Sequence, residues 1–339
     1  MLPPEILTHS FAGSEWSDPV NLGPAINTAA NEVNPTLSPD ALRLYFTSNC
    51  TGGLGAQDIW VSRRDCHTCP WQEAVNLGSP INSGAVDGGP AFSVDGLLLF
   101  FHSGRPGGPG GNDIYVSRRT NPNDDFAWGP PVLLGSDVNT PDIENAPEYL
   151  QSAEDGSANL YFNRGFIGTS SADLYYAAVA HDGQTRGPAT LVAELSLPGA
   201  NEASPTIRTD GREILFWSNR TGAPGGSAIM MSTRRSIPDA WSAPELLPPP
   251  ANAASGAIHP SLSRDGRTAM AVRCCSSPTT GPADSAVRIS GCQPARQAAG
   301  SPMEAAESSR RNSDADMVRW SFGMGITLLG AMAALTKLG

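Results

Sequence analysis

The sequence predicts an all-β protein, a β-propeller built of four-stranded blades. Three observations lead to this prediction: a unit of about 56 residues recurs along the chain, each unit holds four short apolar runs, and turn-forming residues are abundant. Of 339 residues, 36 are glycine and 30 are proline, which is typical of a turn-rich globular chain. A linear β-solenoid is the alternative, but its repeats are usually shorter and lack a four-strand pattern.

Two sequence blocks mark each repeat. The first block reads WQEAVNLG in its clearest copy, and its copies begin at Trp16, Trp71, Trp128, Trp241 and, in a weaker form, Arg186. The second block begins at a proline, with full copies at Pro35, Pro90, Pro147 and Pro205 and a partial copy at Pro260. Five blades are therefore recognisable, and the last one is incomplete.

The second block predicts three strands, and the first block predicts the fourth. The run after the proline leads into an Asp-Gly turn, such as Asp95–Gly96, which is a strong hairpin signal. The next run, Leu97–Phe101, has almost no polar face and predicts a strand buried on both sides. A Gly-rich loop then leads to a third strand, Asp113–Arg118. Val75–Gly78 is typical of the fourth strand.

The N-terminal segment Pro19–Gly23 (PVNLG) precedes the first full block and has no three strands of its own. In a closed ring it would pair with the last blade and remove a free sheet edge. The sequence does not decide whether the ring closes.

The motif P-x-L-S-x-D-G-x-x-L-Y-F-x-S, followed by R-P-G-G-x-G-x-x-D-I-W-V-S, resembles the TolB-like (WD-repeat-like) β-propeller repeats of bacterial proteins. The resemblance covers residues 16–272. It implies a six-bladed parent and a non-enzymatic module that binds a protein partner on one propeller face. It also implies a periplasmic or envelope location. The N-terminus departs from this pattern, because residues 1–15 lack the apolar core of a signal peptide. Because this signal is lacking in the sequence, the chain is expected to be cytoplasmic.

The repeat stops after Val272, and residues 273–339 form a divergent tail. A shifted reading frame from Arg273 permits the peptide VLFISDYRSGGFGGPDIWVSTRA, which is the missing half of the repeat. We therefore expect the tail to be a frameshift product, with a genuine unrelated tail as the alternative. The tail is expected to be disordered, including residues 296–316, which are rich in Ala, Ser and charge. The weakly apolar stretch 320–336 is at the lower limit for a membrane span, and membrane association is not expected.

Repeated charged residues are the candidates for a ligand or ion site. An acid stands three positions before the block's proline in four units, and an arginine ends the second strand in three. These residues are Glu32, Asp87, Glu144, Glu202, Arg105, Arg164 and Arg220. They predict either a polar ring at the channel mouth that holds a cation or a basic ligand, or a structural contact that each blade repeats. The ring also leaves open a propeller hydrolase acting on glycans, since glycosidases use carboxylates.

Two further motifs, the aspartates after the Gly loops and a C-x-x-C sequence, could bind a metal or form a disulfide. We expect Asp58, Asp113 and Asp173 to bond the Gly-loop amides, with calcium binding as the alternative. The motif Cys66-His67-Thr68-Cys69 allows a local disulfide, free thiols or, with ligands from elsewhere, zinc. No catalytic residue, metal or cofactor is predicted. The net charge of −11 argues against a nucleic-acid surface.

Overall fold

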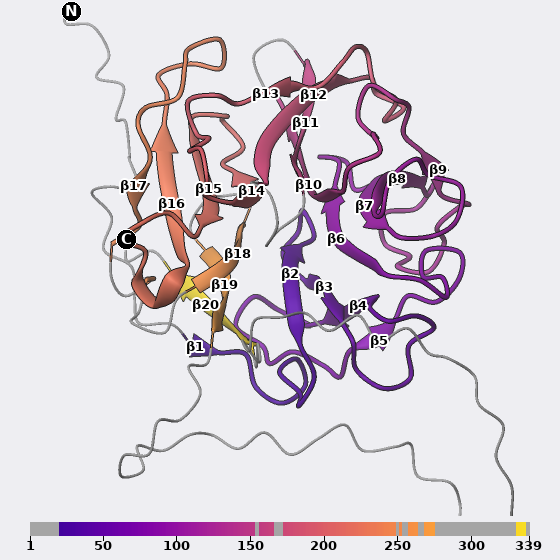
Figure 1. Ribbon diagram of the computed structural model, residues 1–339. Coiled ribbons are helices and arrows are strands. Elements are labelled where there is room, and N and C mark those ends of the chain that lie inside the picture. Colours follow the sequence, from indigo (N-terminus) through magenta and orange to yellow (C-terminus); the bar gives the residue numbers. More distant parts are fainter. Residues whose placement is uncertain are drawn as a thin grey trace, which may run out of the picture.

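The described strands form five sheets of four strands each around a common centre (Figure 1). The computed structural model describes residues 20–152, 156–165, 172–248, 251–252, 257–263, 268–274 and 330–336. Within these residues the all-β propeller prediction is confirmed. In each sheet the innermost strand lies next to the centre, and successive strands lie farther out (Figure 1).

In four sheets the strands follow one another along the chain. The first contains β2 (Glu32–Leu37), β3 (Arg43–Ser48), β4 (Asp58–Arg63) and β5 (Val75–Asn76). The second contains β6 (Asp87–Phe92), β7 (Leu98–Ser103), β8 (Asp113–Arg118) and β9 (Val132–Leu133). The third contains β10 (Glu144–Gln151), β11 (Ala158–Arg164), β12 (Asp173–Val179) and β13 (Thr190–Leu191). The fourth contains β14 (Glu202–Ile207), β15 (Glu213–Ser218), β16 (Ala228–Thr233) and β17 (Glu245–Leu246), with a 3-10 turn at Pro224–Gly226.

The fifth sheet is assembled from both ends of the chain. Its order is β18 (Ala257–Leu262), β19 (Thr268–Cys274), β20 (Gly330–Thr336) and β1 (Val20–Asn21). The N-terminal strand is therefore the outermost strand of the last blade, as the repeat phase predicts. The third position is filled by β20, which no repeat motif indicates.

The five blades close into a ring. The innermost strand β18 of the last blade lies against β14 on one side and against β2 on the other. One hydrophobic cluster joins Ile258 and Met270 of the fifth blade to Leu44 and Phe46 of the first. The described residues thus form five blades, whereas the sequence resemblance implied six.

Much of the C-terminal tail lies outside the described residues, including 275–329. Its frameshift origin and the disorder of 296–316 stay predictions. Of the apolar stretch 320–336, the last seven residues form β20. Among the described residues, no helix has the length and apolarity that a membrane crossing needs.

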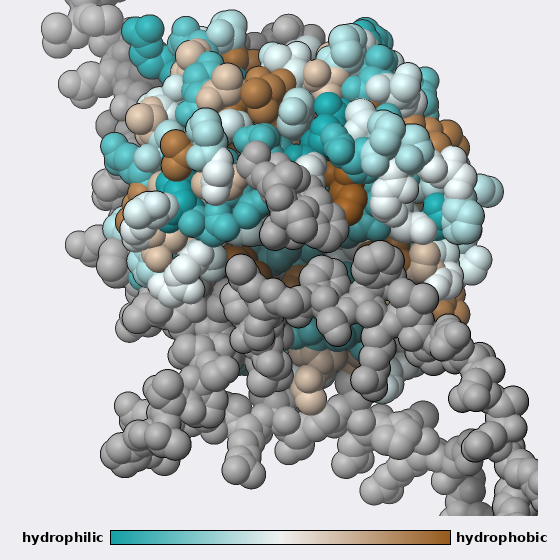
Figure 2. Space-filling model, in the orientation of Figure 1, coloured by the Kyte–Doolittle hydropathy of each residue, from teal (hydrophilic) through white to brown (hydrophobic). Residues whose placement is uncertain are grey.

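Each blade is buried through both faces of its second strand. All six residues of β7 are buried, as its continuous apolar run predicts. Phe100 packs with Leu160 and Phe162 of the third blade, while Phe101 packs with Tyr45 of the first. By contrast, the outermost strands contain two residues each and leave one apolar side chain exposed, which keeps the sheet edges short. On the face seen in Figure 2, hydrophobic residues are scattered among hydrophilic ones.

The repeated tryptophan packs under an arginine. Arg119 lies over the ring of Trp128 at 4.2 Å, and the same pair recurs as Arg64 over Trp71 and Arg234 over Trp241. The arginine Nε also donates to a carbonyl of its blade's inner hairpin, for example Gly96 O at 2.8 Å. This contact ties the third strand and the outer loop to the hairpin turn, which explains why tryptophan and arginine recur together.

A buried aspartate joins the first two blades. Asp125 lies in the loop between β8 and β9, and its carboxylate is fully buried. It accepts a hydrogen bond from the Tyr45 hydroxyl at 2.6 Å and pairs with Arg43 Nε at 2.9 Å and Arg63 Nε at 2.6 Å. Arg119, in the same blade as Asp125, forms a third ion pair, with its Nη1 3.5 Å from Asp125 Oδ1.

Removing the charge of Asp125 should destabilise the ring. We expect Asp125→Asn to lower the free energy of unfolding by about 3 kcal/mol, because it leaves the buried guanidinium group of Arg119 without a counter-ion. Urea denaturation measures the loss. Asp124→Asn, at the exposed neighbouring position, is the matched control and should change stability by less than about 0.5 kcal/mol. Equal stability of the two variants would contradict the role given to Asp125.

Candidate functional site

The four repeated acids begin the innermost strands and are completely buried. Glu144 shows the pattern: Oε1 accepts the Thr140 hydroxyl at 2.6 Å and Oε2 accepts the Thr140 amide at 3.1 Å. Glu32 binds Thr28 in the same way, and Asp87 binds Ser83. Each acid therefore holds the loop that enters its own blade.

The three arginines pair with these acids. Arg105 lies 2.8 Å from Asp87, Arg164 lies 2.9 Å from Glu144, and Arg220 Nη2 lies 3.0 Å from Glu202. Each also lies over an aromatic ring of its blade, as Arg164 does over Tyr175 at 4.5 Å. Glu32 has no arginine partner among the described residues, since the sequence has Cys50 at that position. It keeps the hydrogen bond from the second-strand serine, Ser48 Oγ at 3.3 Å, which Asp87 and Glu202 also accept from their own serines.

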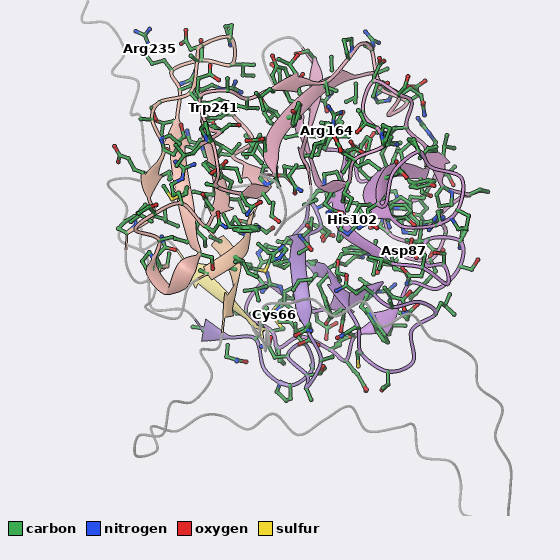
Figure 3. All side chains as sticks on the ribbon, in the orientation of Figure 1. Cys66, Asp87, His102, Arg164, Arg235 and Trp241 are labelled. Atoms are coloured by element: carbon green, nitrogen blue, oxygen red, sulfur yellow. A yellow bond between two sulfur atoms is a disulfide. The ribbon has the colours of Figure 1, made fainter. Side chains whose placement is uncertain are left out.

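None of these seven side chains lines the two central cavities described below. Figure 3 shows Asp87 and Arg164 farther from the centre of the ring than His102. Burial is the largest influence on the pKa of Glu32, Glu144 and Glu202 and raises all three. The seven charged residues make the structural contact that each blade repeats. A role for them in ligand binding stays a prediction. Within the described residues, no three His, Cys, Asp or Glu side chains are grouped to hold a metal.

The remaining sequence candidates have structural contacts. Asp58 Oδ2 accepts the amide of Leu54 at 2.7 Å, and Asp113 accepts that of Gly110, so both bond their Gly loops as expected. Cys66 and Cys69 form a disulfide with each other. Cys50 is also disulfide-bonded.

A repeated bulge lines the centre of the ring. In every blade the residue before the block's proline has a positive φ, between 48° and 61°, and the pairing of the first two strands shifts register there. These residues are Asn34, Gly89, Ala146, Ser204 and His259. Only glycine adopts this conformation without cost, so four blades store strain of about 1 kcal/mol or more at the channel.

One buried histidine, His102, and one partly buried histidine, His259, lie at this bulge. His259 Nδ1 is 2.7 Å from Asn34 Nδ2 and 3.0 Å from Ser204 Oγ. His102 Nδ1 accepts the amide of Ala146 at 3.3 Å. Both rings therefore use Nδ1 as an acceptor, which requires neutral imidazole. Burial lowers the pKa of each histidine to about 4.

Glu148 breaks the symmetry of the channel. It directly follows the block's proline, where the other blades have Thr36, Ala91, Thr206 and Ser261. Its Oε1 accepts the Thr206 hydroxyl at 3.2 Å and the Ile207 amide at 3.3 Å from the next blade. It has no ion pair among the described residues, and burial raises its pKa to about 7.

Glu148 lies between two cavities. A small one of about 20 Å³ lies within the ring of bulges. A larger one of about 460 Å³ opens beyond it, toward the turns between the first and second strands. The larger cavity is lined by Glu148 and Thr36, by the aromatic residues Phe92 and Tyr149, and at its rim by Asp210.

Glu148 is absent from the predicted site residues, because those residues are charged side chains that recur from blade to blade. The signal was present: among the residues that follow the five block prolines, Glu148 is the one acid. Its placement in the channel depends on the bulge, which the sequence does not reveal.

Comparison with known proteins gives a fold relationship. No family model matches the sequence, and no curated protein matches it. Solved structures do match. An α-L-arabinofuranosidase from Podospora anserina, solved with cellotriose, aligns with a TM-score of 0.53 at 11% identity over 96% of this chain and 97% of that one. The catalytic domain of a GH62 α-L-arabinofuranosidase from Coprinopsis cinerea aligns at 0.52, with 12% identity and the same coverage. An exo-1,5-α-L-arabinanase from a bovine ruminal metagenomic library aligns at 0.50, with 16% identity over 74% of this chain and 90% of that one.

These matches correct two predictions. The TolB-like identification is wrong, because the matching structures are glycoside hydrolases. The interpretation as a non-enzymatic module with a protein partner is corrected on the same finding. The misleading motif combines an Asp-Gly turn, a Gly loop and alternating apolar strands. These features serve the turns and strands of a four-stranded blade in general, so the motif indicates architecture rather than family.

Lowering the pH should reduce the free energy of unfolding, because the folded protein holds two histidines in the neutral form. Their folded pKa of about 4 lies below the ordinary 6.5, so the unfolded chain binds protons first as pH falls. Each should therefore reduce the free energy of unfolding by up to about 1.4 kcal/mol per pH unit between these values. Urea denaturation at pH 6.5 and 4.5 should show a smaller loss in His102→Gln and in His259→Gln than in the unaltered protein. Identical losses would contradict burial of neutral imidazole.

Proposed function

We propose that this protein is a glycoside hydrolase that acts on a glycan in the cavity beside Glu148, with Glu148 as the general acid. The observation that carries the proposal is a single carboxyl group with a raised pKa at the inner end of a central cavity. The likeness in fold to two arabinofuranosidases over almost the full length of both chains supports this choice of chemistry.

The cavity has the size and lining that a sugar ligand requires. Its volume of about 460 Å³ falls within the range of small-molecule sites. Phe92 and Tyr149 supply apolar surface, while Glu148 and Gln151 supply polar groups. Sugars present both apolar ring faces and hydroxyl edges, so such a mixed lining suits them.

Protonation of Glu148 suits the acid role. With a pKa of about 7, a large fraction of this carboxyl group carries a proton at neutral pH. A protonated carboxyl group can give its proton to the glycosidic oxygen as the bond to the leaving sugar breaks.

The second carboxylate in this proposal is Asp210, at the rim of the same cavity. Hydrogen bonds from Arg208 and from the Arg212 amide help to hold the pKa of Asp210 below its usual value, so it is ionised. Two carboxyl groups whose pKa values are pushed apart divide into an acid and a base or nucleophile. Asp210 therefore takes the ionised role.

One observation favours a second candidate, a propeller that binds a glycan without cleaving it. Asp210 also caps its hairpin turn, where its Oδ1 accepts the Arg212 amide at 3.0 Å and Arg208 Nε at 2.8 Å. A carboxylate engaged in this way is held back from the substrate.

Hydrolysis of 4-nitrophenyl α-L-arabinofuranoside and of arabinan by the full chain tests the proposal. We expect Glu148→Gln to lower kcat by about 10²–10⁴-fold, the usual contribution of a general acid. Glu245→Gln, at an exposed position of β17, is the matched control and should leave kcat unchanged.

Calorimetry with arabinan-derived oligosaccharides separates the two candidates. Binding without turnover selects the second one, and neither binding nor turnover rejects both.

The pH profile gives an independent check on the role of Glu148. Because the acid form is the active one, kcat should fall as pH rises through about 7. The initial rate, measured between pH 5 and 9, should lose about tenfold per pH unit on the alkaline side. A profile flat through this range would remove Glu148 from the acid role.

A further inference from the structure

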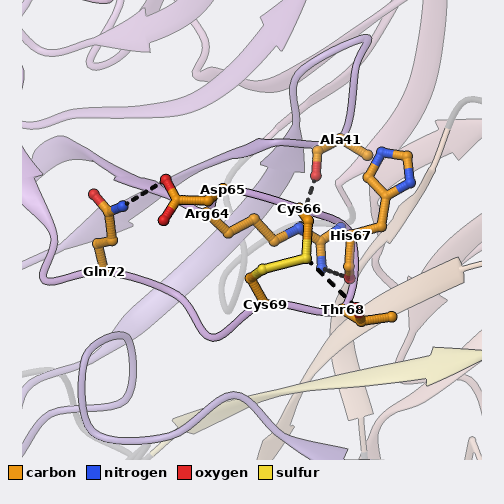
Figure 4. Close-up of a disulfide and its surroundings, with 8 residues drawn as sticks. All are labelled: Ala41, Arg64, Asp65, Cys66, His67, Thr68, Cys69 and Gln72. Atoms are coloured by element: carbon orange, nitrogen blue, oxygen red, sulfur yellow. Dashed lines mark hydrogen bonds between the residues drawn. A yellow bond between two sulfur atoms is a disulfide. The ribbon is translucent and has the colours of Figure 1, made fainter.

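We propose that Cys66 and Cys69 form a thiol–disulfide exchange site in a surface loop of the first blade. The two cysteines lie in the loop between β4 and β5 and are joined by a disulfide (Figure 4). The site is separate from the central cavity, since neither cysteine lines it.

Access favours exchange. Both cysteines are partly exposed, and His67 and Thr68 between them are exposed. Exchange requires that a thiolate approach one sulfur atom directly, so a disulfide in a surface loop meets a condition that a buried disulfide does not.

A short loop favours a redox role over a stabilising one. The disulfide spans a sequence separation of three residues. The stabilisation from a disulfide grows with the length of the loop it closes, so this one constrains the unfolded chain little. The loop also has other anchors: the Cys69 amide donates to Cys66 O at 3.0 Å, and Arg64 Nη1 donates to His67 O at 2.7 Å. The loop therefore has contacts that persist when the disulfide is reduced.

The surroundings single out Cys66 as the reactive thiol. Cys66 Sγ lies 3.5 Å from Thr68 Oγ1, and because a disulfide sulfur carries no proton, the hydroxyl is the donor. The same hydroxyl can donate to the thiolate, and this hydrogen bond favours the thiolate form. The loop carries both Arg64, which donates to His67 O, and the Asp65 carboxylate, so the hydroxyl is the feature that distinguishes Cys66.

The exchange balances as a two-electron transfer. In the reduced protein, the Cys66 thiolate attacks one sulfur of a partner disulfide, and a partner thiolate leaves and takes up a proton. The Cys69 thiolate then attacks Cys66 Sγ, which reforms the internal disulfide and releases the second partner thiol. Glutathione disulfide is the simplest partner of this class, and glutathione reverses the reaction.

The first experiment equilibrates the full chain with glutathione and glutathione disulfide at pH 7 and measures the pair by alkylation and peptide mass spectrometry. Reading this one peptide keeps Cys50 and the tail cysteines separate. We expect the pair to pass fully between reduced and oxidised forms as the ratio changes, while tryptophan fluorescence shows that the fold is retained. A pair that stays oxidised throughout, or is reduced only on unfolding, overturns the proposal.

The second experiment tests the assignment of Cys66. In the reduced protein at pH 7, iodoacetamide should alkylate Cys66 about threefold faster than Cys69, because a thiol with a pKa one unit lower has more thiolate but a less nucleophilic one. Cys69→Ser should accumulate a mixed disulfide with glutathione on Cys66, whereas Cys66→Ser should accumulate little. Thr68→Val should slow alkylation of Cys66, and Thr120→Val, an exposed threonine in the equivalent loop of the second blade, should not. Equal alkylation of both cysteines overturns the assignment.

Discussion

No blade of this propeller can bury its own two faces, so the fold depends on contact between neighbouring blades around a closed ring. The second strand of each blade shows this most clearly. In β7, Phe100 is covered by the third blade and Phe101 by the first. Burying such a side chain contributes about 1.5–3 kcal/mol, and the contribution exists only while both neighbours are in place. Polar contacts across the same joints, such as Thr36 Oγ1 to Pro90 O at 2.6 Å, then fix how one blade is aligned with the next.

The features that recur in every blade and those that occur once have different roles. The repeated acids are satisfied within their own blades by a loop amide and a hydroxyl. The arginine–tryptophan pairs hold loops in the same place in three blades. Glu148 stands at a position where the other blades carry neutral residues, and it faces the cavity. Asp125 also occurs in one blade, but its carboxylate is surrounded by arginines, whereas Glu148 has no ion pair among the described residues and is therefore the clearer indication of a binding or catalytic site.

The sequence predicts the repeating parts of the structure closely, since turn chemistry and strand patterning are local. The expected strand Asp113–Arg118 has the bounds of β8, and the pairing of the N-terminal segment with the last blade follows from the phase of the repeat. The site is less predictable, because Glu148 reaches the channel through a bulge. The five residues at this bulge, four of them non-glycine, differ in size and share only their backbone conformation. The third strand of the fifth sheet is equally hidden, since Gly330–Thr336 has no counterpart in the repeat.

The pairing of β1 with β20 also governs how the chain can fold. Val20 is opposite Ala334 and Asn21 is opposite Ala333, so the contact that completes the ring joins residues more than 300 positions apart. The first four blades consist of local hairpins, which can form while the chain is being synthesised. The fifth sheet gains its two outer strands only after the residues of β20 have left the ribosome. Ring closure is therefore a late step of high contact order, and contacts of this kind slow folding and prolong the exposure of unpaired strand edges.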